Sequence, residues 1–224
     1  MFYESTISKK HQLLRQLCLL VLTGLLCGCG AKLVAKGGPD EAGYEAQGSV
    51  EDTEPSLINT IDNEDGTFTS IVDAMNYDNW VLFSFATQTE VLPSGEPSTS
   101  SEWDLGFKRY DIILNSGISG PGETMVAAVV EEDFESMTKA PLTNYLPDLE
   151  DSDDEDEDPD YGFSQAGTWY DYNSADHTLT PKDIVFIVRT GTGRYYKIKI
   201  EDYYNEVGDS GVFTLTWGEL DAPE

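Results

Sequence analysis

Hydrophobic and polar residues alternate with the two-residue period of β-strands along much of this chain. The clearest case is the run from Trp103 to Gly117, in which bulky residues at 103, 105, 107 and 110 are interrupted by polar or small residues at 104, 106, 108 and 111. The glycine-rich segment 117–122 follows directly. The pattern predicts a half-buried strand that ends in a glycine-rich loop.

Other segments repeat this alternation and add a hairpin. Two apolar runs, 184–189 and 195–200, flank the turn sequence Thr-Gly-Thr-Gly at 190–193, which predicts two strands joined by a tight turn. In the second run, Lys197 and Lys199 are expected on the face opposite Tyr196, Ile198 and Ile200. Further strands are predicted at 80–91, 124–130, 168–172 and 212–217, and short helical turns at 73–79 or 134–139. The sequence therefore predicts an all-β, antiparallel domain.

The first 29 residues have the pattern of an export signal. Lys9, Lys10 and Arg15 precede the apolar stretch 17–26, which is too short to span a bilayer as a helix. Its end reads Leu26-Cys27-Gly28-Cys29 and resembles the bacterial lipobox, in which Cys29 would be lipidated. Cys27 fits that pattern less well because Leu26 is bulky, and a plain secretory signal is the alternative. Gly30 favours the outer membrane over retention at the inner one.

Composition sets the expected domain limits. Residues 30 to about 57 are rich in Gly, Ala, Glu, Asp and Ser, and such a segment buries too little apolar surface to fold alone. We predict a signal peptide over 1–28, a flexible tether over 29–60 and one β domain over 61–221. No cysteine follows Cys29, which excludes disulfides and cysteine-based metal sites from the domain.

The chain is strongly acidic, with 13 Lys and Arg against 42 Asp and Glu and a net charge of −29. Without residues 1–28 the counts become 10 and 41, a net charge of −31. This balance argues against nucleic acid as a partner, because binding phosphates requires basic residues. Anionic membranes would also repel the domain, so attachment would depend on the lipid at Cys29.

Part of the negative charge lies in one run, 148–160, within a predicted loop insertion over 147–160. Like charges at this density favour a solvated, extended loop. Carboxylate oxygens also suit Ca²⁺, and a calcium site is the functional alternative. The run lacks the glycine at the sixth position and the glutamate at the twelfth position of an EF-hand loop.

Several of these segments, in this order, resemble the HmuY family of haem-binding lipoproteins. Trp103 to Gly122 is similar to the first signature of that family, and 133–141 (Asp-Phe-Glu-Ser-Met-Thr-Lys-Ala-Pro) is similar to the segment that follows it. The second half is matched by 169–172, 177–181 and the hairpin that ends at Tyr204. The resemblance covers about residues 65–220. It implies an all-β fold that captures haem outside the cell for delivery to an outer-membrane haem receptor.

The resemblance also implies two axial ligands, His or Met, that hold the haem iron from loops at one end of the domain. The candidates are His177, Met137 and Met125. His177 lies in the predicted loop 173–181, where a turn histidine bonded to nearby backbone is the alternative. Met137 and Met125 have core packing as their alternative, and Met75 is expected in the core.

One loop departs from the family pattern. Between Pro141 and Thr168, where a first ligand would be expected, the sequence has no His or Met, and Tyr145 and Tyr161 are the only residues there with iron-binding chemistry. The acidic run occupies this loop and would repel the haem propionates. Four basic residues could offset that charge if they line the same mouth: Lys108, Arg109, Lys139 and Lys182.

Two function classes therefore stay open. One is a haem-binding lipoprotein that catalyses nothing, since no nucleophile triad, zinc-protease motif or phosphate loop is present. The other is an interaction lipoprotein on the same scaffold that binds a protein partner or Ca²⁺ through its acidic loop.

Overall fold

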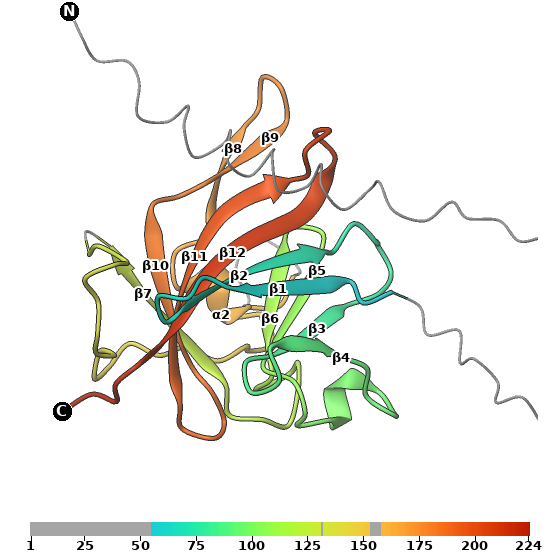
Figure 1. Ribbon diagram of the computed structural model, residues 1–224. Coiled ribbons are helices and arrows are strands. Elements are labelled where there is room, and N and C mark those ends of the chain that lie inside the picture. Colours follow the sequence, from blue (N-terminus) through green and yellow to red (C-terminus); the bar gives the residue numbers. More distant parts are fainter. Residues whose placement is uncertain (1–54, 131, 153–157) are drawn as a thin grey trace, which may run out of the picture. The chain divides into compact units, whose positions relative to one another are not determined.

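A computed structural model describes residues 55–130, 132–152 and 158–224, and the predicted signal peptide and Cys29 lie outside these ranges. The domain is built almost wholly of strands (Figure 1). The strands are β1 (Ile58–Asp62), β2 (Thr67–Asp73), β3 (Val81–Ser84), β4 (Thr89–Val91), β5 (Leu105–Lys108), β6 (Asp111–Leu114), β7 (Met125–Val130), β8 (Tyr170–Asn173), β9 (Thr178–Pro181), β10 (Ile184–Arg189), β11 (Tyr195–Tyr204) and β12 (Ser210–Leu220). Two short helices, η1 (Pro97–Thr99) and α2 (Gly162–Gln165), lie in loops.

The strands form three antiparallel sheets. A six-stranded sheet has the order β1-β2-β12-β11-β10-β7, a four-stranded sheet has the order β4-β3-β5-β6, and β8 pairs only with β9. All pairs within these sheets are antiparallel, which confirms the predicted fold class. The predicted hairpin of β10 and β11 is also confirmed. The first strand begins at Ile58, slightly before the expected domain start at 61.

The main core lies between the two larger sheets. One hydrophobic cluster combines residues from both, and its centre is aromatic. Phe83 of β3 meets Trp217 of β12 at a ring-centroid distance of 5.7 Å, and Phe107 of β5 meets Phe213 of β12 at 5.2 Å. Each such buried side chain contributes roughly 1.5–3 kcal/mol through burial. The indole N–H of Trp217 donates to Ser70, so its one polar atom is satisfied.

The opposite face of the six-stranded sheet is covered by segment 132–146. Phe134 and Ala140 of this segment pack on Val185 and Ile187 of β10 and form a second hydrophobic cluster. Lys197 lies beneath the segment, as the predicted alternation along β11 requires. It is buried there, and its ammonium donates to the backbone carbonyls of Phe134 and Met137 at 2.6 and 2.9 Å.

Two predicted strands are each a hairpin. The prediction of one strand from Trp103 to Gly117 is wrong, because the chain reverses at Arg109 and Tyr110 between β5 and β6. Arg109 adopts a positive φ of 53° there. The strand predicted at 80–91 likewise consists of β3 and β4 with a turn between them.

The glycine-rich loop wraps around one buried side chain. The Asn115 amide donates to the carbonyls of Ser100 and Trp103, and its oxygen accepts from the N–H of Gly122. A Cβ atom on Gly120 would lie 2.1 Å from the Asn115 side-chain oxygen. Glycine is therefore required by close approach, and this loop has a structural role.

The acidic run is not solvated throughout, and that prediction is wrong at its first and last residues. Asp148 is fully buried, and its carboxylate accepts from the backbone N–H groups of Leu114 and Gly162 at 2.8 and 2.7 Å. Asp160 is also buried, and its backbone pairs with Leu149. Residues 153–157 lie outside the described part. Both ends of the run are thus fixed to the domain.

Candidate haem site at the β8–β9 hairpin

His177 lies in the turn of the two-stranded hairpin β8–β9. In its register Tyr170 is opposite Pro181, and Tyr172 is opposite Leu179. Directly opposed residues share a face, and residues two apart along a strand do as well. One face of the hairpin is therefore apolar and carries two tyrosines, whereas Asp171 and Thr180 point to the other side.

The exposed imidazole of His177 stands at the free end of this apolar face. Its Nδ1 is hydrogen-bonded to the Tyr172 hydroxyl, and its backbone N–H donates to the carbonyl of Asn173. In the tautomer that donates from Nδ1 to the tyrosine oxygen, Nε2 presents a lone pair to solvent. Ligating histidines are commonly oriented in this way by a second hydrogen bond. His177 is therefore a turn residue, but its imidazole is bonded to the Tyr172 side chain and not to nearby backbone.

The base of the hairpin joins the domain through aromatic residues. Tyr170 and Leu179 pack against the main core, and the N–H of Leu179 donates to the Tyr204 hydroxyl at 2.8 Å. Tyr110, in the turn between β5 and β6, lies 6.2 Å from Tyr170, and its carbonyl accepts from the Trp169 indole. The apolar face thus runs from the core to Tyr172, which is 55% exposed.

Two of the four predicted basic residues lie at this end of the domain. Lys182 directly follows β9, where its ammonium donates to the carbonyl of Gly167 and lies 3.9 Å from Asp171. Arg109 stacks on Tyr77 and donates to the backbone carbonyl of Ser210, at the start of β12. Lys108 is held over the Trp80 ring.

The four basic residues do not line the opening of a single site, as they would need to in order to offset the charge of the acidic run. Lys139 forms an ion pair with Glu224 and bridges to Asp221, beyond the far end of β12. Arg109 contacts Ser210, so the eleven residues of β12 separate the two sites, a span of about 35 Å. In Figure 1 the β8–β9 hairpin projects beyond the end of the sheet where β12 begins, and the C-terminus lies beyond the opposite end of β12.

Met137 lies far from His177. The carbonyl of Met137 is bonded to Lys197, whereas the His177 hairpin is bonded to Tyr204. These two positions on β11 are about 20 Å apart at the rise of a strand. Met125, on the edge strand β7, pairs with Arg189 near the same end as Met137. Met75 is half-buried, and its carbonyl accepts from Arg109 at the His177 end.

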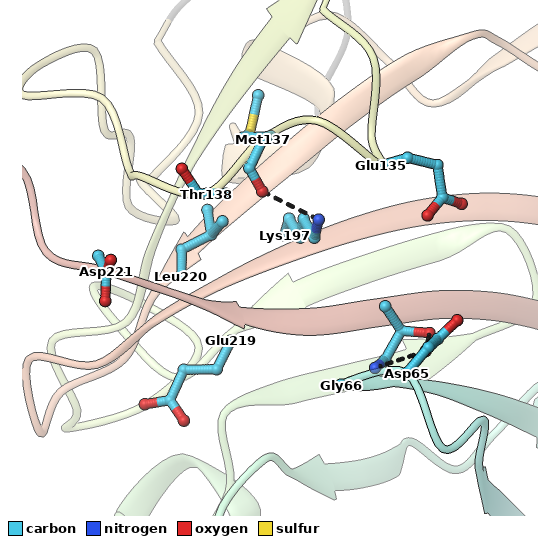
Figure 2. Close-up of a pocket in the computed structure, with 10 residues that line it drawn as sticks. Asp65, Gly66, Glu135, Met137, Thr138, Lys197, Glu219, Leu220 and Asp221 are labelled. Carbon is cyan, nitrogen blue, oxygen red and sulfur yellow. Dashed lines mark hydrogen bonds between the residues drawn. The ribbon is translucent and has the colours of Figure 1, made fainter.

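The pocket beside Met137 is acidic. It has a volume of about 570 Å³, and Figure 2 shows carboxylates on several sides of it, with Lys197 turned toward the carbonyl of Met137. Burial lowers the pKa of the Lys197 ammonium. A pocket with this lining repels the propionates of haem. The carboxylates are Asp65, Glu135, Glu219 and Asp221.

The two tyrosines of the loop 141–168 are half-buried and lie apart. Tyr145 donates to the carbonyl of Pro141 and packs on the outer cluster, whereas Tyr161 meets Trp80 beside the four-stranded sheet. Burial raises the pKa of both phenols. The raised values disfavour the phenolate that would bind iron.

Among residues 55–130, 132–152 and 158–224, no three or more His, Cys, Asp or Glu side chains gather closely enough to hold a metal ion. The calcium site that was the alternative interpretation of the acidic run therefore has no support in that part of the chain, while residues 153–157 of the run lie outside it. The same described ranges contain no helix whose length and hydropathy would let it cross a bilayer.

Several solved structures share this fold. The apo HmuY analogue of Tannerella forsythia is 18% identical over 78% of this chain and 100% of its own, with a TM-score of 0.52. A candidate haem-binding protein of HmuY type from Bacteroides vulgatus is 19% identical over 73% and 97%, with a TM-score of 0.52. Apo PinO from Porphyromonas gingivitis is 16% identical over 69% and 97%, with a TM-score of 0.53.

Among curated proteins, none matches this chain. Residues 76–217, well over half of the chain, match the family described as HmuY protein. That stretch includes the β5–β6 hairpin, the glycine-rich loop and the His177 hairpin, which are the segments that carry the resemblance in the sequence. The chain is a member of the HmuY family.

Proposed function

We propose that this protein binds haem at the β8–β9 hairpin, with Nε2 of His177 as an axial ligand to the iron. The observation that carries the proposal is the exposed imidazole at the end of an aromatic face, held through Nδ1 by Tyr172. It supplies the ligand atom and the apolar surface that one porphyrin face requires. Lys182 lies at the base of the same hairpin and offers a cation to a propionate.

Membership of the HmuY family supports haem as the bound molecule. The geometry favours His177 over the two methionines as the iron ligand. Met137 stands beside four carboxylates, and Met125 lies at the same end of the sheet as Met137. At the His177 end the described residues offer tyrosines and the basic side chains of Arg109 and Lys182, although the exposed carboxylates of Asp171 and Asp176 also lie at the hairpin.

The rest of the proposed role follows from the sequence. An exported lipoprotein anchored through Cys29, at the outer membrane or cell surface, would hold its domain on a flexible tether and pass haem to an outer-membrane receptor. Such a protein binds and transfers its cargo without catalysing a reaction. Capture by one exposed ligand would also make release to a receptor easy.

Titration of the mature protein with haemin, followed at the Soret band, tests the proposal. We expect a saturable shift at micromolar haemin, which weakens at least tenfold in His177→Ala and is unchanged in the control Met137→Leu. An unshifted Soret band would overturn haem binding altogether. A normal titration with His177→Ala would overturn the assignment of the ligand and retain the function.

A further inference from the structure

A second pocket, of about 300 Å³, lies on the outer side of the four-stranded sheet. Its floor includes Ile113 of β6, which belongs to a small cluster with Leu82 and Trp103 on that side of the sheet. The volume is at the lower end of the range for small-molecule sites, which are typically apolar with a few polar groups. Nothing in the haem proposal uses this pocket.

Two aromatic rings line the pocket and meet almost at a right angle. The ring centroids of Trp80 and Tyr161 are 6.3 Å apart, with an angle of 82° between the ring planes. Trp80 is half-exposed, whereas the other three tryptophans of the chain are buried. Lys108, which is not part of the pocket lining, already places its ammonium 4.5 Å from the centre of the Trp80 ring. This contact shows that the Trp80 ring can hold a cation.

The surroundings of the pocket are negatively charged. Glu96 is exposed and lines the pocket, together with the hydroxyl-bearing Ser98 and Ser119. The pKa of the Tyr161 phenol is raised by burial first, and then by the carboxylates of Asp111, Asp148 and Asp158. These three carboxylates therefore create a negative potential at the pocket wall. An anion such as a haem propionate is disfavoured here, and a cation is favoured.

We propose that this aromatic pocket binds an organic ammonium group. The π-faces of Trp80 and Tyr161 contact its alkyl substituents, and Glu96 supplies the counter-charge. Perpendicular aromatic walls with a nearby carboxylate suit an alkylated ammonium, which is only weakly hydrated and gains from cation–π contact. A bare metal ion is a poorer match, because hard cations require several oxygen ligands around one point. The ammonium can belong to a free small molecule or to a lysine side chain of a protein.

Nuclear magnetic resonance of the tryptophan indole N–H groups tests this binding directly. The mature protein is titrated with choline and, in a second arm, with capped lysine. The neutral carbon isostere of choline, 3,3-dimethylbutan-1-ol, is the control. We expect a saturable shift of the Trp80 signal, with the signals of Trp169 and Trp217 unmoved. Saturation by choline assigns the pocket to free ammonium compounds, and saturation by lysine alone assigns it to a basic side chain. Absence of saturation in both arms, or equal binding of the isostere, overturns the proposal.

Two variants locate the site. Trp80→Leu lacks the reporting indole, so its choline affinity is measured by calorimetry, as is that of the wild type. It should weaken the binding of choline at least about tenfold, since a desolvated cation–π contact is lost. The buried indole signals of the same sample show whether this variant is folded. Glu96→Gln removes only an exposed charge and should weaken binding severalfold while the affinity of the neutral isostere stays unchanged. Unaltered choline affinity in both variants would place the ammonium elsewhere and overturn the assignment.

Discussion

A Cβ atom on Gly117 would lie 1.7 Å from the backbone carbonyl oxygen of Asp148. The glycine-rich loop and the acidic run, which look unrelated in the sequence, thus touch backbone to backbone. The Asp148 carboxylate adds bonds to Leu114 and Gly162 at the same place. Together these contacts fasten the start of the acidic run to the end of β6.

Gly117→Ala should therefore destabilise the domain strongly. Gly117 has a φ of +54°, so alanine would be strained in addition to the steric clash. We expect the free energy of unfolding to fall by at least about 3 kcal/mol in urea denaturation followed by tryptophan fluorescence. Gly66→Ala is the matched control: φ is +88° there, but nothing lies within 4 Å of the added Cβ, so a loss of about 1 kcal/mol is expected. Equal losses would show that the contact with Asp148 is unimportant.

Asp148→Asn should change the pH dependence of stability. Burial raises the pKa of Asp148 above its ordinary 3.8, so its protonation stabilises the fold. That contribution is complete below the ordinary pKa and is lost as the pH rises through the raised value. We expect the stability advantage of the wild type over Asp148→Asn to grow as the pH falls from 7 to 4, measured by urea denaturation at each pH.

Asp183→Asn supplies a control of opposite sign. Lys199 holds the pKa of Asp183 below its ordinary value, so the advantage of the wild type over this variant should shrink as the pH drops below 3.8. Parallel pH profiles for the two variants would contradict the assigned roles of both carboxylates.

Lys197→Met should loosen segment 132–146. The ammonium of Lys197 is the donor to two carbonyls of that segment, and methionine would leave both without it. We expect a loss of about 2–3 kcal/mol in the free energy of unfolding and faster amide hydrogen exchange in 134–140. Lys199→Met, which breaks a partly exposed ion pair with Asp183, should cost at most about 1 kcal/mol. Unchanged exchange in 134–140 would refute the anchoring role.

Tyr172→Phe should weaken the proposed haem site without removing its ligand. The hydroxyl of Tyr172 fixes the ring of His177, and loss of such a supporting bond typically lowers metal affinity about 10- to 100-fold. The Soret titration described above measures this change. Tyr145→Phe also removes one tyrosine hydrogen bond, but at the Met137 end, and should bind haemin normally. Normal haemin binding by Tyr172→Phe together with weak binding by Tyr145→Phe would place the haem site at the Met137 end instead.

The sequence predicts a hairpin well where the turn contains residues typical of turns. It predicts a hairpin poorly where tertiary contacts alone hold the turn. The β10–β11 turn contains Gly193, whose φ is +80°, and was therefore identifiable. The β5–β6 turn has neither glycine nor asparagine at Arg109 and Tyr110. Arg109 is held there by bonds to Ser210 and to the carbonyl of Ala74, distant in sequence, which no local pattern could indicate.

The site was predictable only in part for a related reason. His177 stands out as the one histidine after the predicted signal, but its partner face requires the register that places Tyr172 opposite Leu179. Strands β1 and β2 were not predicted. Strand β2 pairs with β12, which is far away in the sequence, so no local pattern indicates it. Phe68 of β2 stacks on Trp217 at 4.5 Å.

The backbone pairing of Leu149 with Asp160 has a consequence for the history of this loop. Because the pair brings positions 149 and 160 together, the entropy of closing the chain between them depends only weakly on the number of residues in between. Doubling such a loop costs only about 0.6 kcal/mol of closure entropy. Acidic residues could therefore accumulate there without disturbing either sheet, and the same position should accept an inserted peptide tag.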